Sequence, residues 1–331
     1  MKRRNLIAFA MGAAAGLGNG PAAARPHTAA MQWQSRTLQA MGTAMTVRAA
    51  HAEGAVLARA LDAAVDDIRT LEDQMSLYRE GSAITRLNQA GRLERAPNHL
   101  LQVLRVAQDV SRRSGGAFDV TVQPLWAAYA TAQSQGRLPT PAEIHAARRP
   151  VDWRQLHVGA HTVSLAQTGM AITLNGIAQG YCADVVRLRL QSLGVADALV
   201  DTGEWAALGE SAHGTDWSLG LADPRAPGEL LATVALRGRC IASSADDQCR
   251  FSPDGRDHHI FDPMAGRSPP ELAAVTVAAR SCVMADALTK VFFVAGYDRA
   301  LPLARAWGVD VLVVDKKGRW QASEGFGARV L

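Results

Sequence analysis

The sequence of 331 residues lacks an apolar run as long as a membrane-spanning helix needs, about 18 residues or more. It has only four cysteines, Cys182, Cys240, Cys249 and Cys282, and their spacing matches no zinc-binding pattern such as C-x-x-C. An even number of cysteines permits disulfides in an oxidising compartment, but we favour buried, unpaired thiols. The sequence therefore predicts neither a transmembrane span nor a zinc module.

A large excess of charge is also missing. Lys plus Arg total 35 and Asp plus Glu total 31, which gives a net charge of +4, and Lys2, Arg3 and Arg4 supply three of the positive charges. No other basic block with interleaved aromatics occurs, which argues against a nucleic acid partner. Hydrophobic residues make up 48% and charged residues 20% of the chain, which is typical of a globular protein with a sizeable core.

Three widespread functional motifs are absent as well. The chain has no G-x-x-x-x-G-K-[ST] phosphate loop, no G-x-G-x-x-G after a predicted strand and no G-x-S-x-G nucleophile elbow. These absences argue against a P-loop nucleotidase, a dinucleotide-binding domain of the doubly wound type and a hydrolase with a serine nucleophile.

The first 24 residues have the organisation of an export signal. The basic residues 2–4 precede a weakly apolar stretch over residues 5–18 and the small residues of 21–24. Paired arginines and modest hydrophobicity favour the twin-arginine route, whereas the glycines of this stretch argue against a buried helix. We therefore expect a signal peptide over residues 1–24, a flexible tether over 25–35, a domain over 36–331, and a periplasmic or otherwise exported location.

The remaining chain has helical patterns early and strand patterns late. Helices are predicted at 56–78, 100–114, 181–193, 284–294 and 299–307, and strands at 45–49, 198–201, 217–221, 231–236, 240–243, 258–261, 273–278 and 309–314. Residues 130–160 are polar and contain short elements that the pattern does not place. This order favours an α+β fold over alternating βαβ units, and no linker divides the chain.

Three groups of residues suggest chemistry. Residues 176–180 lead into a helix, where glycines let backbone N–H groups approach an anion, although a plain strand-to-helix turn is the simpler alternative. Asp286 is expected at the start of another helix, where it suits the dipole or acts as a cap. His258, His259 and Asp262 lie close together. Alternation along a strand would point the histidines to opposite faces, so we favour one general base over a metal site.

Several segments carry glycine or polar motifs in a distinctive order. They are residues 41–43, 76–78, 82–88, 115–125, 175–181, 199–204, 259–269 and 285–290. Together they resemble the ApbE family, the FAD:protein FMN transferases, and the likeness runs from about residue 41 to residue 296. The resemblance implies an ApbE-like single large domain of the α+β class, with mixed or antiparallel sheets flanked by helices.

The resemblance also implies a reaction and its residues. FMN would pass from FAD to a Thr or Ser hydroxyl of a partner flavoprotein, AMP would leave, and Mg²⁺ would offset the pyrophosphate charge. The implied FAD contacts are Met41, Tyr78, Ala117, Phe118, Asp119, Thr173, Gln179 and Phe261. The implied metal-side residues are the Gly176 carbonyl, Asp286 and the step Thr289–Lys290. His259 would deprotonate the acceptor, with Asp286 as the second catalytic residue.

Several positions depart from the family motif. Lys290 replaces the usual metal-side threonine, and an ammonium cannot ligate Mg²⁺. Lys290 is expected either to neutralise phosphate itself or to leave Thr289 as the ligand. Gln179 replaces a lysine, and Asn175 and Glu204 replace glycines.

Two other functions suit the same residues. One is an FAD-binding protein without transferase activity. The other is an FAD pyrophosphatase, which would use water in place of the acceptor hydroxyl and release FMN and AMP.

Overall fold

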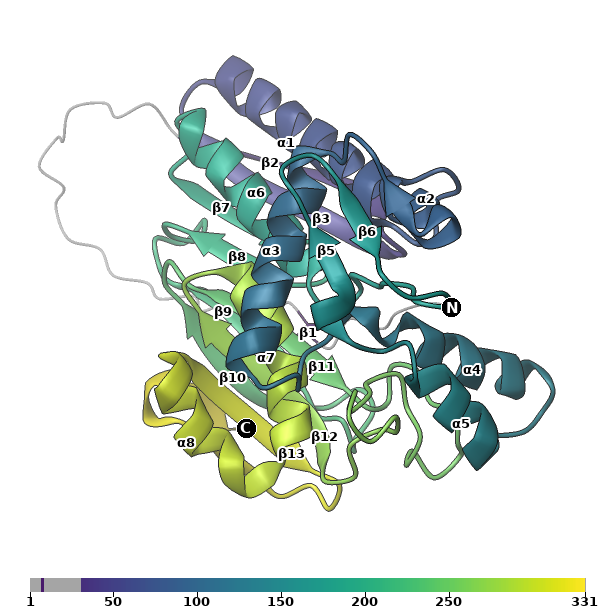
Figure 1. The fold of residues 1–331 in the computed structure, drawn as a ribbon. Coiled ribbons are helices and arrows are strands. Elements are labelled where there is room, and N and C mark those ends of the chain that lie inside the picture. The colour runs from purple at the N-terminus through teal and green to yellow at the C-terminus, as the bar shows by residue number, and fades with distance from the viewer. Residues whose placement is uncertain (1–6, 9–30, 331) are drawn as a thin grey trace, which may run out of the picture.

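The computed structural model describes residues 7–8 and 31–330 of the chain, which form three layers (Figure 1). The middle layer is an eight-stranded sheet in the order β14-β13-β12-β11-β8-β7-β3-β2, and each pair of neighbouring strands is antiparallel. Its strands are β2 (Gln32–Ala40), β3 (Thr43–His51), β7 (Asp197–Asp201), β8 (Trp205–Leu208), β11 (Cys240–Ala245), β12 (Leu272–Ala279), β13 (Asp310–Asp315) and β14 (Trp320–Ala322).

Helices cover one face of this sheet. The helices next to the strands are α1 (Gly54–Met75), α6 (Ala178–Ser192), α7 (Cys282–Ala295) and α8 (Tyr297–Trp307), and α3 (Asn98–Arg113) lies against α1 and α7 (Figure 1). The others are α2 (Ala83–Ala90), α4 (Gln123–Ser134) and α5 (Pro141–Arg148). No helix within residues 31–330 is both long and apolar enough to cross a membrane.

Two smaller sheets complete the fold. A four-stranded sheet on the other face of the large sheet contains β1 (Ile7–Ala8), β9 (Trp217–Ala222), β10 (Leu230–Leu236) and β15 (Ala328–Val330). A three-stranded sheet contains β4 (Arg92–Leu93), β5 (Leu156–Val158) and β6 (Val163–Leu165).

The burial pattern of β13 shows why the large sheet is covered twice. Val311 and Val313 belong to the core beneath the helices, whereas Leu312 and Val314 belong to the core shared with β9 and β10. Successive side chains of a strand point to opposite faces, so a strand with a core on each side is apolar throughout. The α+β class with antiparallel sheets is therefore confirmed.

The sequence misplaced two segments. The tether expected over 25–35 overlaps β2, because residues 32–35 already pair with β3; residues 25–30 lie outside the described part. The strand expected over 258–261 is wrong, since an isolated bridge between Arg250 and His258 stands in its place. There the His258 Nδ1 accepts from the Ile260 N–H at 3.4 Å, a local bond that competes with strand pairing.

The expected signal peptide, residues 1–24, lies outside the described residues except for Ile7–Ala8, which pair with β9.

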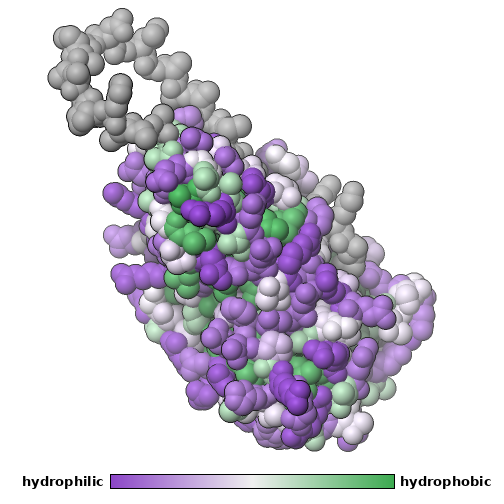
Figure 2. All heavy atoms as spheres, turned by 90° about the horizontal axis from the view of Figure 1, so that it is seen from above, coloured by the Kyte–Doolittle hydropathy of each residue, from purple (hydrophilic) through white to green (hydrophobic). Residues whose placement is uncertain are grey.

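The face in Figure 2 is mostly hydrophilic, and its hydrophobic areas are separated by polar side chains. Scattered apolar areas of this kind are ordinary for a protein surface.

Candidate functional site

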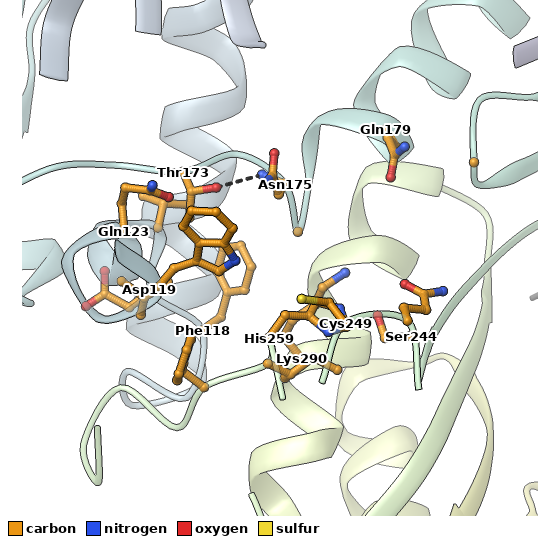
Figure 3. Close-up of a pocket in the computed structure, with 18 of the residues that line it drawn as sticks. Phe118, Asp119, Gln123, Thr173, Asn175, Gln179, Ser244, Cys249, His259 and Lys290 are labelled. Atoms are coloured by element: carbon orange, nitrogen blue, oxygen red, sulfur yellow. Dashed lines mark hydrogen bonds between the residues drawn. The ribbon is translucent and has the colours of Figure 1, made fainter. Parts of the chain in front are cut away.

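A cavity of about 360 Å³ opens between the segment that leads into α4 and the residues Ser243 and Ser244 of β11 and Lys290 of α7. Phe118, Gln123 and Thr173 lie on one side of it, and Ser244, Cys249 and Lys290 lie on the other (Figure 3). Its volume falls in the range of sites that hold small molecules and cofactors.

Aromatic side chains form one part of the wall. Phe118, Trp126 and Phe261 line the cavity, and Phe261 packs against the buried Tyr129 with a centroid distance of 5.1 Å. Tyr78 is 60% exposed at the mouth of the cavity and accepts from Asn175 Nδ2 through its hydroxyl oxygen at 3.3 Å. This wall offers flat, apolar faces for an aromatic ligand.

The turn between β2 and β3 supports the Tyr78 ring. Gly42 has φ +78°, and a Cβ at this position would lie 3.1 Å from Tyr78 Cε2. Glycine suits both the left-handed backbone and the close approach of the ring. The neighbouring Met41 (φ 47°) is buried in the core, and its N–H donates to Glu72 Oε1 at 2.8 Å.

Asp119 fixes the loop that carries Phe118. Its Oδ1 accepts from the backbone N–H and from the Oγ1 of Thr121, both at 2.7 Å, and its Oδ2 accepts from the Trp153 N–H at 3.0 Å. Burial raises the pKa of the Asp119 carboxyl, and these hydrogen bonds oppose that rise. The carboxylate is thus occupied by protein groups and holds the loop in place.

The first turn of α6 meets α7 without intervening side chains. A Cβ at Gly180 would lie 2.3 Å from the carbonyl oxygen of Cys282, so only glycine allows the two helices this distance. The Gly180 N–H donates to Asp286 Oδ2 at 3.1 Å. The expectation that Asp286 begins its helix is wrong, because α7 starts at Cys282 and Asp286 is its fifth residue. The carboxylate instead accepts from an N-terminal N–H of α6, where a negative charge is favourable.

Lys290 lies one turn further along α7 and enters the cavity. Its Nζ donates to Asp286 Oδ1 at 2.6 Å and to the Asp286 carbonyl oxygen at 3.1 Å. The Lys290 side chain also lies against Gly176, where a Cβ would be 2.9 Å from Lys290 Cε. The ammonium therefore lies between the turn before α6 and the Asp286 carboxylate.

The residues expected to hold Mg²⁺ do not suit that ion. Both oxygens of the Asp286 carboxylate are engaged, one by Lys290 and one by Gly180. The Thr289 hydroxyl is fully buried, donates to the Asp286 carbonyl oxygen at 2.7 Å and lies 2.8 Å from Ser244 Oγ. Among the described residues there is no group of three or more His, Cys, Asp or Glu that suits a metal ion. Mg²⁺ requires several oxygen ligands in octahedral geometry, and the engaged oxygens of Asp286 and Thr289 do not offer them.

The two adjacent histidines occupy different environments, 6.4 Å apart between ring centroids. His259 is half-buried and lines the cavity near Cys249 and Lys290 (Figure 3). His258 is fully buried, and its Nε2 lies 3.4 Å from the Pro269 carbonyl oxygen. Burial, together with the positive charge of Lys316, lowers the pKa of His258 to about 4. Of the two, only His259 lines the cavity as a candidate general base.

Most of the residues implied by the family motif meet at the cavity. They are Tyr78, Ala117, Phe118, Asp119, Thr173, Gly176, Gln179, His259, Phe261 and Lys290. Met41, Asp286 and Thr289 lie behind the wall and support Gly42, Lys290 and Ser244, respectively.

Sequence reasoning missed other lining residues. Trp126 directly follows the motif of residues 115–125, and its position on the first turn of α4 was a usable signal. Gln248 and Cys249 come from a loop without a recognisable pattern. Glu204, noted only as a departure, is 5% exposed and accepts from the Ser243 N–H at 3.0 Å.

Known proteins are similar to this chain in sequence and fold. The FAD:protein FMN transferase of Treponema pallidum is 33% identical over 294 residues, 81% of each chain, and that of Vibrio cholerae is 30% identical over 83% of this chain and 85% of its own. The crystal structure of the Thermotoga maritima ApbE protein matches with a TM-score of 0.79 at 26% identity, over 89% of this chain and 98% of that one. The apo flavinyl transferase ApbE of Pseudomonas stutzeri matches with a TM-score of 0.77 at 29% identity, over 91% and 98%.

These likenesses cover the cavity as well as the core. The model of the ApbE family matches residues 41–313, which include the lining residues from Gly42 to Lys290. The chain therefore belongs to the ApbE family.

Proposed function

We propose that this chain transfers FMN from FAD to a Thr or Ser hydroxyl of a partner flavoprotein and releases AMP. The observation that carries the proposal is the meeting of three features at one cavity: an aromatic wall, the N-terminal turn of α6 beside Lys290, and His259. The names of the relatives, FAD:protein FMN transferase and flavinyl transferase, support the same reaction.

The cavity suggests a place for each half of the donor. The isoalloxazine ring is aromatic and flat, which suits the wall of Tyr78, Phe118 and Trp126. The pyrophosphate is anionic, which suits the N-terminus of α6 and the Lys290 ammonium. The reacting phosphorus would then lie on the side of the cavity that His259 lines.

The chemical step is a displacement at phosphorus. The acceptor hydroxyl oxygen forms a bond to the phosphorus of the FMN half, and the bond from that phosphorus to the bridging oxygen breaks. The bridging oxygen leaves with AMP, and the hydroxyl proton passes to the imidazole of His259. General base catalysis of this kind contributes about 10²–10⁴-fold to a rate.

The test measures the intact mass of a candidate acceptor after incubation with FAD. We expect a gain of one FMN unit, with AMP in solution, and a transfer rate at least about 100-fold lower for His259→Asn. His157→Asn, which changes an exposed histidine on β5, is the matched control and should transfer normally. FMN and AMP without a gain in mass would indicate a pyrophosphatase. Intact bound FAD with every acceptor would indicate a flavin-binding protein.

We also propose that the chain is exported by the twin-arginine route. The proposal depends on residues 1–24, with their paired arginines, short apolar stretch and small residues before position 25. Changing Arg3 and Arg4 together to lysine should retain an unprocessed precursor in the cytoplasm, as measured by cell fractionation and mass. Normal export of that double variant would contradict this route.

A further inference from the structure

The cavity has little positive charge along its described wall. Lys290 is the only lysine or arginine among the described residues that line it, whereas two carboxylates, Asp119 and Glu204, line it as well. The pyrophosphate of FAD carries about two negative charges. A site that binds this group therefore needs a cation, and Lys290 is the one that the described wall supplies.

The Lys290 ammonium is held in a fixed place. An ammonium has three N–H donors, and two of them go to the side chain and to the carbonyl oxygen of Asp286. Lys290 is 19% exposed, so its stem is packed while the head reaches the cavity. The third N–H remains available for an oxygen of a ligand.

The same contacts exclude a divalent ion from this position. A metal ion bound to Asp286 would have to displace Lys290 from Oδ1 or Gly180 from Oδ2. The Lys290 side chain is 19% exposed, so an ammonium displaced by the metal ion would lose its charged partner in a partly buried place. Two positive ions beside the same carboxylate would also repel each other.

We propose that the Lys290 ammonium is the resident cation of this site, which neutralises the pyrophosphate of FAD in place of a divalent metal ion, so that the chain binds FAD and transfers FMN without Mg²⁺. The proposal rests on the proposed function and names its cation. During transfer, the ammonium donates a hydrogen bond to the oxygen that leaves with AMP. The bonds that form and break are those given above, and Lys290 keeps its proton throughout.

The test measures the affinity of the full chain for FAD by flavin fluorescence, once in EDTA and once in 5 mM MgCl₂. The wild type should bind with the same affinity in both solutions, within about twofold. Lys290→Thr removes the ammonium and leaves Asp286 Oδ1 open to an ion. The affinity of this variant for FAD should fall about 10–100-fold in EDTA, because the charged hydrogen bond from the ammonium is lost. It should recover in MgCl₂, because a Mg²⁺ ion beside Asp286 then supplies the positive charge. Lys290→Met should bind weakly in both solutions.

Lys317→Met is the matched control, because Lys317 is exposed in the turn after β13 and is not among the lining residues. It should bind as the wild type does. Recovery of Lys290→Thr in MgCl₂ also shows that this variant folds.

A wild type whose FAD affinity rises tenfold or more on adding Mg²⁺ would overturn the proposal, as would a wild type that binds FAD in neither solution. Transfer has a separate readout, the mass of the acceptor. Metal-independent binding without any mass gain would refute the proposed transferase and leave Lys290 as the resident cation. Mass gain that disappears in EDTA would refute the role of Lys290 and leave the transferase.

Discussion

Replacing Gly180 with alanine should force α6 away from α7. The added Cβ would lie 2.3 Å from the Cys282 carbonyl oxygen and 2.7 Å from Asp286 Cβ. Neither atom belongs to the flexible end of a side chain, so a rotamer change cannot relieve the contact. The backbones must separate, and the bond from the Gly180 N–H to Asp286 lengthens as they do.

The expected cost follows from two opposing effects. Overpacking at a rigid contact costs about 3 kcal/mol, the upper end of the usual range. Alanine in place of glycine within a helix returns about 1 kcal/mol. The net loss of about 2 kcal/mol should lower Tm by about 4 °C, at about 2 °C for each kcal/mol in a chain of this size.

Thermal unfolding followed by circular dichroism measures this loss. Gly54→Ala is the matched control, because Gly54 begins α1 and its added Cβ would meet only the side-chain amide of Gln32, the mobile end of a side chain. Gly54→Ala should keep or slightly raise Tm. If Gly180→Ala is as stable as the control, the close contact between the helices does not exist as described.

Three further changes test other parts of the chain. His258 has a pKa of about 4 when folded against about 6.5 unfolded, so the folded state excludes a proton and stability falls as pH drops from 6.5 to 4, by up to about 3 kcal/mol. His258→Phe should remove this loss, so that urea unfolding gives nearly equal unfolding free energies at pH 5 and pH 7. A pH dependence equal to that of the wild type would contradict the prediction. Burial raises the Asp201 pKa to about 6, which favours the folded state at low pH in both proteins and cancels in their difference. Asp246→Asn should cost about 2 kcal/mol in the same assay, because it leaves Arg225 and Lys316 without their buried carboxylate; a change below about 0.5 kcal/mol would refute this. Tyr78→Leu should weaken FAD binding about 2–10-fold in a flavin fluorescence titration through loss of the aromatic face, and equal affinity would place the flavin elsewhere.

The part of the site that depends on motifs was predictable from the sequence. The motifs brought Phe118, Thr173, His259 and Lys290 to one cavity, where the first three lie in loops and Lys290 lies within α7. The partner of Lys290 was less evident. Residues four apart on a helix are neighbours, so the pairing of Asp286 with Lys290 follows once the helix is known. Local pattern could not show that the second Asp286 oxygen bonds to α6.

The segment over residues 130–160 shows where periodicity fails. Helix α5 has no buried residue, so its apolar pattern carries no signal. The start of α5 was nevertheless readable from the sequence. Thr140 and Glu143 form a capping box, and Pro141 occupies the first turn of the helix. The misassigned strand at 258–261 has another cause, because the His258 side chain accepts from the Ile260 N–H and the His258 N–H donates to Ser268 Oγ, and these bonds replace strand pairing.

The strand order of the large sheet delays the completion of strand pairing during synthesis of the chain. β2 and β3 form a local hairpin, but the next neighbour of β3 is β7, about 150 residues later. At ribosomal speeds of about 5–20 residues per second, the edge of β3 stays unpaired for about 8–30 s until β7 has been synthesised. An unpaired edge is a template for aggregation, so synthesis of this chain should depend on chaperones during that interval.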